Sequence, residues 1–161
     1  MNHTASLVAE LANRLQSLRW QMATAESCTG GMIAAACTDL SGSSAWFERG
    51  VVSYSNAAKQ ELLRVPSALI ADHGAVSEAV ARAMAQGACQ VAPVHATVAV
   101  TGIAGPGGGS VDKPVGTVWM AWCIQGVTEA RGFCFPGDRQ QVRQATVDEA
   151  LRGLLTRLPH A

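Results

Sequence analysis

The sequence predicts an α/β fold, organised as a single three-layer α/β/α domain with a mixed sheet over residues 1–161. Segments with helical periodicity alternate along the chain with segments rich in β-branched residues. The run from Val94 to Thr101 fits a central strand that is covered on both faces. Gln125-Gly126-Val127 separates two strand-like segments, which predicts a hairpin and therefore antiparallel pairing in part of the sheet.

The first 55 residues are predicted to contain two helices and two strands. Leucines recur at helical spacing from Thr4 to Leu18, with polar residues between them, which indicates an amphipathic helix and not a signal peptide. A short strand is expected over 21–25 and an alanine-rich helix over 29–38. The turn-rich segment 39–44 then separates this helix from a strand over 47–55.

The rest of the chain is predicted to continue the alternation. A helix over 57–64 is ended by Pro66, and Ser77 is suited to cap a helix that reaches Val91. The central strand leads into a glycine-rich loop at 102–109, followed by strands over 115–124 and 128–135. Asp138 is expected to cap a last helix that ends near Leu158.

Composition excludes several classes of protein. Lys plus Arg and Asp plus Glu both number 12, so the chain lacks the basic surplus that is typical of nucleic-acid binders. The five cysteines form no C-x-x-C pair and the four histidines show no metal-ligand spacing, so neither a metal site nor a disulfide framework is expected. No apolar stretch is long enough to span a bilayer, and a reducing cytoplasm is the simplest setting.

Ser27 lies where a strand gives way to a helix, beside Thr29, Gly30 and Gly31. Serine is a favoured helix cap, and spacing alone favours this structural role. However, two glycines lower helix propensity, and they suit close approach of a ligand to backbone N–H groups that could hold an oxyanion or a phosphate. Cys28 is the alternative nucleophile, because thiols are intrinsically more reactive than hydroxyls.

Tyr54 and Lys59 flank a predicted strand-to-helix junction. In a purely structural interpretation, Tyr54 packs with its hydroxyl at the surface and Lys59 lies on a solvated helix face. In a functional interpretation, burial of Lys59 lowers its pKa, so that Lys59 takes a proton directly or through Tyr54.

Two further features could bind an anion. The loop at 102–109 has five glycines in eight residues. Gly102 and Gly107 have the spacing of a Walker A motif, but the next residue is Gly108 and not the required Lys. The loop does not match the dinucleotide-binding fingerprint either. Arg139 and Arg143 lie one turn apart at the start of the last helix, where positive charge opposes the helix dipole unless an anion is bound. A flexible loop and two solvated arginines are the structural alternatives.

Together these segments resemble the C-terminal domain of the competence/damage-inducible CinA proteins and the stand-alone bacterial nicotinamide-nucleotide amidases. The resemblance covers nearly the whole chain, in order, and rests on five stretches: Ala25-Glu26-Ser27-Cys28-Thr29-Gly30-Gly31, Gly50–Asn56 with Lys59, Ala75-Val76-Ser77, Thr101–Gly108, and Phe135–Arg139 with Arg143. The long CinA proteins carry an additional N-terminal nucleotide-hydrolysing domain, which is not expected in this chain.

The resemblance implies that the carboxamide of nicotinamide mononucleotide is hydrolysed to nicotinic acid mononucleotide and ammonia. It implies a metal-free, cofactor-free serine amidase in which Ser27 is the nucleophile and Tyr54 and Lys59 activate it. Thr101 and the loop behind it, with Gly102, Gly105 and Gly107, would line the same pocket, and one or both arginines would bind the phosphate. A homodimer or larger homo-oligomer is also implied.

Two other functions remain open at this point. The chain could be a non-catalytic nucleotide-binding or regulatory module linked to competence or DNA damage. It could also be a thiol amidase that uses Cys28. The resemblance weakens this alternative, because it implies a family that does not require cysteine at this position.

Overall fold

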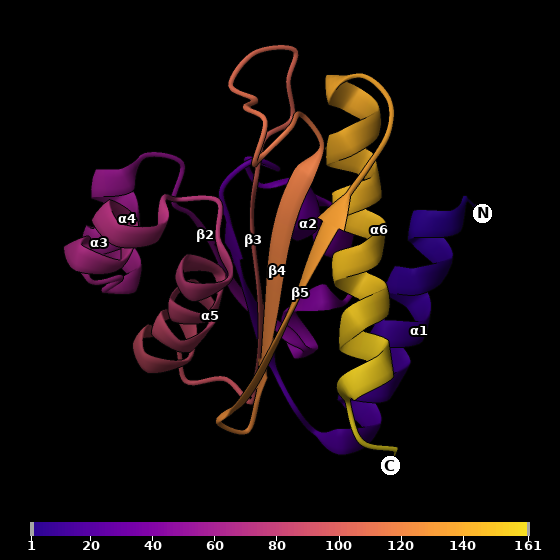
Figure 1. Ribbon diagram of the computed structural model, residues 1–161. Helices are drawn as coiled ribbons and strands as arrows, with labels where there is room; N and C mark the ends of the chain where they lie inside the picture. Colours follow the sequence, from indigo (N-terminus) through magenta and orange to yellow (C-terminus); the bar gives the residue numbers. More distant parts are fainter. Residues whose placement is uncertain (1, 161) are drawn as a thin grey trace.

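The computed structural model describes residues 2–160, and its centre is a five-stranded mixed sheet (Figure 1). The strands lie in the order β2-β1-β3-β4-β5. β1 pairs in parallel with β2 and β3, whereas β4 is antiparallel to both β3 and β5. The α/β class and the mixed sheet predicted from the sequence are therefore confirmed. The strands are β1 (Met22–Glu26), β2 (Phe47–Val52), β3 (Ala96–Gly102), β4 (Thr117–Ile124) and β5 (Val127–Cys134).

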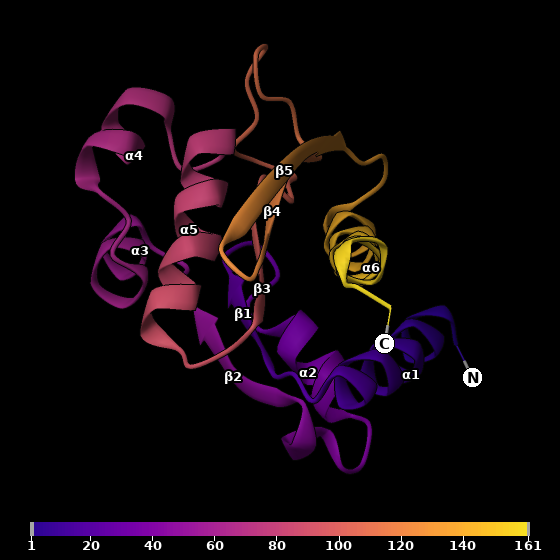
Figure 2. The same ribbon diagram turned by 90° about the horizontal axis from the view of Figure 1, so that it is seen from below.

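Helices cover both faces of this sheet, which gives three layers (Figure 2). One face carries α1 (His3–Leu18), α2 (Met32–Thr38) and α6 (Arg139–Arg157). The other face carries α5 (Glu78–Val91), with α3 (Asn56–Leu63) and α4 (Ser67–His73) packed beside it. None of the helices in residues 2–160 combines the length and the apolar character that crossing a bilayer requires.

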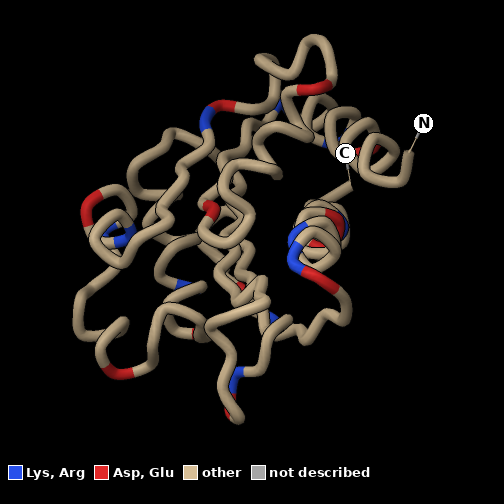
Figure 3. The backbone as a smooth tube through the Cα atoms, turned by 90° about the horizontal axis from the view of Figure 1, so that it is seen from above, with Lys and Arg blue, Asp and Glu red and all other residues tan. Residues whose placement is uncertain are grey.

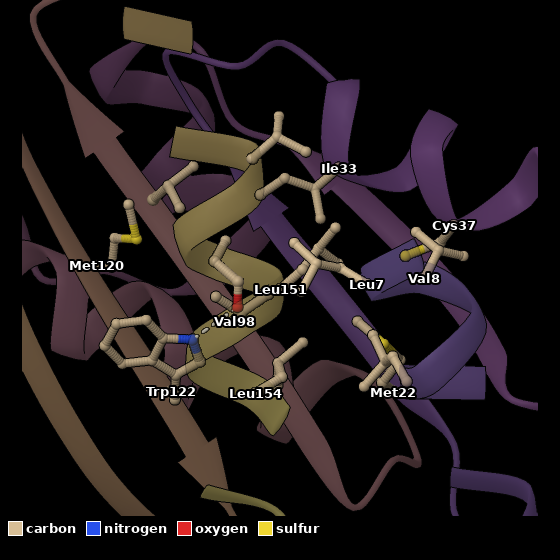
Figure 4. Close-up of a cluster of buried hydrophobic side chains, with 14 of the residues drawn as sticks. Leu7, Val8, Met22, Ile33, Cys37, Val98, Met120, Trp122, Leu151 and Leu154 are labelled. Atoms are coloured by element: carbon tan, nitrogen blue, oxygen red, sulfur yellow. Dashed lines mark hydrogen bonds between the residues drawn. The ribbon is translucent and has the colours of Figure 1, made fainter. Parts of the chain in front are cut away.

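The larger core lies between the sheet and the first of these helical layers (Figure 4). Met22, Val98 and Trp122 project from three adjacent strands against leucines of α1 and α6. The indole N–H of Trp122 donates to the carbonyl of Ala150 at 3.0 Å, so its one polar atom is satisfied within the core. The opposite face of the sheet packs on α5 through small residues, which allows α5 to approach the sheet closely.

Local sequence signals located two of the helix caps and the hairpin correctly. Ser77 accepts a hydrogen bond from the N–H of Val80, and Asp138 forms a capping box with Gln141. β4 and β5 are joined by Gln125 and Gly126, both with positive φ, as a two-residue hairpin requires.

Two element boundaries differ by three residues from the prediction, and one helix was not predicted. α2 begins at Met32 and not at Thr29, because Gly30 and Gly31 adopt φ values of 58° and 105°. β2 ends at Val52 and not near Ser55, because Ser55 caps the next helix by accepting from Ala58 N–H at 3.0 Å. The short helix α4 was not predicted, since seven residues carry too little periodicity to identify one.

Gly87 determines how closely α5 approaches the end of α3, the helix that carries Lys59. A Cβ at this position would lie 1.8 Å from the backbone oxygen of Leu63. Alanine normally stabilises a helix relative to glycine by about 1 kcal/mol. Here the clash dominates, and Gly87→Ala is expected to lower the free energy of unfolding by about 2 kcal/mol or more, measured by urea denaturation.

The matched control is Gly107→Ala, since a Cβ at Gly107 meets no atom within 4 Å in the described structure and the backbone there is not left-handed. We expect its free energy of unfolding to stay within about 0.5 kcal/mol of the wild type. Equal stability of the two variants would contradict the close approach of α5 to Leu63.

Candidate active site

A cavity of about 220 Å³ lies at the edge of the sheet where the parallel strands β1 and β3 end. This is where α/β folds place their ligand sites. The cavity is lined by residues from five separate segments: Ser27 and Cys28; Tyr54, Asn56 and Lys59; Ala75 and Val76; Thr101, Gly102 and Ala104; and Arg139.

A larger hollow, about 620 Å³, lies between α1, α2 and α6, on the face of the sheet away from Lys59. Its lining is mostly apolar and contains no serine, cysteine or lysine. We place the candidate active site in the smaller cavity, because that cavity joins a possible nucleophile to a possible base.

Ser27 and Lys59 form the centre of the site. The Nζ of Lys59 lies 2.9 Å from the Oγ of Ser27 and also donates to the carbonyls of Ser53 and Tyr54, at 3.0 and 3.1 Å. The lysine is 1% exposed, and it lies on the same buried face of α3 as Leu63, one turn further on. Sequence analysis expected both residues in the site, and the structure brings them into direct contact.

Burial lowers the pKa of Lys59 below its ordinary value of 10.5, because the charged ammonium loses its hydration in the interior. Two carbonyls and a hydroxyl surround the amine, and none of the ion pairs within residues 2–160 involves it. The neutral amine is therefore favoured more than in water, and its lone pair can accept the Ser27 proton.

Tyr54 contributes a different atom from the one that sequence analysis expected. Its side chain is 62% exposed, and its hydroxyl lies 3.5 Å from Nη2 of Arg139. Its backbone carbonyl accepts from Lys59 Nζ and lies 3.5 Å from Ser27 Oγ. Direct contact between lysine and serine makes proton transfer through the phenol unnecessary.

Ser27 does not cap α2, so the helix-cap interpretation of this serine is wrong. The N-cap position belongs to Gly31, which offers no side chain, and the N–H groups of Ile33 and Ala34 donate instead to the carboxylate of Glu26, each at 2.9 Å. Sequence analysis gave no role to Glu26, because a single Glu at the end of a strand carries no recognisable signal.

The Thr29-Gly30-Gly31 segment, which was expected to contact the substrate, is not part of the cavity lining. The Gly30 N–H donates to the Ser27 carbonyl at 3.1 Å, and the glycines serve a tight turn with positive φ. Cys28 lines the cavity, and its backbone N–H donates to no backbone carbonyl among residues 2–160, so this N–H is a candidate donor for an oxyanion.

Arg143 contacts the backbone of the segment that carries Ser27. Its Nε donates to the carbonyl of Cys28 at 3.0 Å and its Nη2 donates to the carbonyl of Thr29 at 3.2 Å. It does not line the cavity. The guanidinium holds the segment that carries Ser27 and uses two of its five N–H donors on peptide carbonyls.

Arg139 does line the cavity, at the start of α6. Its Nη1 donates to the carbonyl of Gly105 at 2.9 Å, which ties the glycine-rich loop to α6. Gly102 lines the cavity as predicted, and Thr101 lines it while donating to the carbonyl of Ala75 at 2.9 Å. Gly105 and Gly107 do not line it.

Cys28 borders the cavity but is chemically unsuited to be the nucleophile. Its side chain is buried, and burial raises the pKa of the thiol to about 11. Only the thiolate is strongly nucleophilic, so the thiol is almost wholly protonated near neutral pH.

Asn56, Ala75, Val76 and Ala104 complete the lining, and sequence analysis assigned none of them to the site. Ala75 and Val76 belong to the stretch Ala75-Val76-Ser77, which carried part of the family resemblance. That resemblance was the one indication in the sequence that these two residues could lie in the site. Lys59 and Arg139 are the cationic residues of the lining, and it contains no carboxylate. Elsewhere Lys and Arg are interspersed with Asp and Glu over the molecule (Figure 3), and residues 2–160 contain no group of His, Cys, Asp and Glu that could hold a metal ion.

Known proteins match this chain over almost its full length. The family model described as the CinA C-terminal domain matches residues 4–158. A protein named nicotinamide-nucleotide amidohydrolase PncC, from Pseudomonas putida, is 49% identical over 96% of this chain and 97% of its own length. A CinA-like protein from Citrifermentans bemidjiense is 54% identical over 91% of this chain, which spans only 36% of that longer relative.

Solved structures agree with these sequence matches. The crystal structure of the competence damage-inducible protein A (ComA) from Klebsiella pneumoniae superposes with a TM-score of 0.94 at 42% identity, covering 98% of both chains. A competence/damage-inducible protein from Agrobacterium tumefaciens gives a TM-score of 0.95 at 40% identity, covering 97% of this chain and 96% of that one.

Proposed function

This chain belongs to the CinA C-terminal domain family, and from that premise we propose that it is an amidohydrolase that converts nicotinamide mononucleotide to nicotinic acid mononucleotide and ammonia. Two relatives of nearly the same length, from Pseudomonas putida and Escherichia coli, bear the name nicotinamide-nucleotide amidohydrolase. The observation that carries the proposal is the 2.9 Å contact between Ser27 Oγ and the buried amine of Lys59.

In the proposed mechanism, the neutral amine of Lys59 takes the proton of Ser27 as Oγ attacks the carboxamide carbon. The carbonyl oxygen becomes an oxyanion that the N–H of Cys28 stabilises. The Lys59 ammonium then returns its proton to the departing nitrogen, so that ammonia leaves and an ester to Ser27 remains. Water, deprotonated by Lys59, cleaves this ester to give the carboxylic acid and free serine.

The test is to incubate the purified protein with nicotinamide mononucleotide and to measure both products, ammonia and nicotinic acid mononucleotide. Formation of the two in equal amounts supports the proposal. Binding of the nucleotide without either product, detected as a thermal shift, would instead support a non-catalytic nucleotide-binding module.

We further propose that Arg139 recognises the phosphate of the substrate. Arg139 lines a cavity that lacks carboxylates, and charge-assisted hydrogen bonds to phosphate contribute about 1.5–3 kcal/mol. Arg139→Gln is therefore expected to raise KM for the mononucleotide by about 10-fold or more, with a smaller effect on kcat, in steady-state assays.

The corresponding nucleoside, nicotinamide riboside, lacks the phosphate and provides the internal comparison. Its KM should not distinguish the wild type from Arg139→Gln. Arg131→Gln serves as the matched charge control, because Arg131 is exposed on β5 and stacks over Phe133. A KM increase of the same size for both substrates would argue against phosphate recognition by Arg139.

A further inference from the structure

Glu26 is the last residue of β1 and directly precedes Ser27. Successive side chains of a strand point to opposite faces of the sheet. Glu26 therefore points to the face covered by α2, where Thr24 Oγ1 lies 3.4 Å from its Oε2. Ser27 points to the face where α3 presents Lys59. One peptide unit thus links a carboxylate on one face to the proposed nucleophile on the other.

The carboxylate of Glu26 is 0% exposed and is surrounded by hydrogen-bond donors. Its Oε1 accepts from the hydroxyl of Thr29 at 2.6 Å and from the N–H of Ile33 at 2.9 Å, and its Oε2 accepts from the N–H of Ala34 at 2.9 Å. No cation within residues 2–160 forms an ion pair with it. An ionised carboxylate is an acceptor at both oxygens, whereas a glutamine amide would place an NH₂ donor against one of these N–H groups.

These contacts fix the turn that follows Ser27. Gly31, at the N-cap of α2, has no side chain to hold the helix start, so Glu26 supplies that hydrogen bonding from the strand side. Arg143 of α6 holds the same turn by donating hydrogen bonds to the carbonyls of Cys28 and Thr29. The turn is therefore tied to α2 and to α6 while Ser27 Oγ rests against Lys59 Nζ.

We infer that Glu26 is a positioning residue for the proposed reaction: it holds the Ser27–Thr29 segment so that the serine hydroxyl stays within reach of Lys59. This inference rests on the proposed function. Glu26 does not line the cavity, so it does not touch the substrate. Its loss should therefore lower kcat and leave KM nearly unchanged.

Glu26→Gln keeps the size of the side chain and removes one acceptor. We expect kcat for nicotinamide mononucleotide to fall by about 10- to 100-fold, since small displacements of reacting groups have effects of this size. KM should stay within about threefold. The control is Thr97→Val, which removes an equally buried hydrogen bond, from Thr97 to the Ala85 carbonyl at 2.8 Å, away from the cavity. It should keep the wild-type kcat.

A second readout reports on Ser27 without the natural substrate. A fluorophosphonate labels an activated serine: Oγ bonds to phosphorus, fluoride leaves, and the serine proton passes to Lys59. The labelling rate of Glu26→Gln should fall by the same factor as kcat. Thr29→Val, which removes one of the donors to Glu26 and keeps the side-chain shape, is a milder variant that should show a smaller loss in both readouts if Glu26→Gln does not fold.

The outcomes separate the inference from the proposed function. Wild-type kcat and labelling in Glu26→Gln, or an equal loss in Thr97→Val, would overturn the positioning role while leaving the amidase proposal intact. A second outcome is that the wild type is labelled, that Glu26→Gln slows the labelling, and that the mononucleotide is not hydrolysed. This outcome would overturn the proposed substrate and support the positioning role. Absence of both activities in the folded wild type would overturn both.

Discussion

Ser27→Ala is expected to lower the rate of nicotinamide mononucleotide hydrolysis by about 10³-fold or more. The alanine has no oxygen to attack the carboxamide, and loss of a nucleophile removes the chemical step rather than substrate binding. KM, or the dissociation constant from a thermal shift titration, should therefore change little. Ammonia release under saturating substrate is the measurement.

Ser17→Ala provides the control, because Ser17 is an exposed serine on α1, far from the cavity. It should retain the wild-type rate. The thiol alternative predicts the opposite pattern, with activity kept in Ser27→Ala and lost in Cys28→Ala. That pattern would also require the thiolate to form despite a pKa raised by burial to about 11.

Lys59→Met is expected to reduce the rate by a similar factor, about 10³-fold. Methionine fills the volume of the lysine stem but supplies no lone pair to take the Ser27 proton. Residues that act as one unit have non-additive effects, so the double variant Ser27→Ala, Lys59→Met should be no slower than either single variant. Additive losses would show that the two side chains act independently.

Wild-type kcat/KM should rise with pH through the pKa of Lys59, because only the neutral amine accepts a proton. Burial places that pKa below 10.5, so the profile should level off before the pH at which an exposed lysine titrates. A kcat/KM that shows no rise with pH below 10.5 would contradict a role for Lys59 as the general base.

The same burial makes a prediction about stability. Lys59 has its ordinary pKa of 10.5 in the unfolded chain and a lower pKa in the folded protein, so unfolding takes up a proton between these two values. The free energy of unfolding should therefore rise with pH across that window, and below it the buried lysine destabilises the fold to its full extent. Lys59→Met removes this penalty, so its gain in Tm over the wild type should be larger at pH 7 than at pH 10.

Features encoded locally could be predicted from the sequence. Asp138 and Ser77 cap helices through hydrogen bonds to residues three positions away, and the Gln125-Gly126 turn depends on two adjacent residues. Alternation of helical and strand patterns was sufficient for the fold class. α4 escaped prediction because its seven residues show no dominant period.

The geometry of the site could not be predicted, because it depends on contacts between segments that are far apart in the sequence. Ser27 and Lys59 were identified as candidates, but their 2.9 Å contact arises from the pairing of β1 with β2 and from the path into α3. The hydrogen bonds from Arg143 to two carbonyls 114–115 residues away could not be predicted from its spacing to Arg139. Similarly, nothing adjacent in sequence indicates that Glu26 replaces the missing cap of α2.

The cavity draws on residues scattered from Ser27 to Arg139, and no contiguous part of the chain contains more than a fraction of it. Catalytic competence should consequently be among the last properties to return when the denatured protein is refolded. Until α6 docks, the glycine-rich loop lacks its hydrogen bond from Arg139 and the turn after Ser27 lacks its hydrogen bonds from Arg143. Enzymatic turnover is thus a stricter reporter of the native state of this domain than its secondary structure.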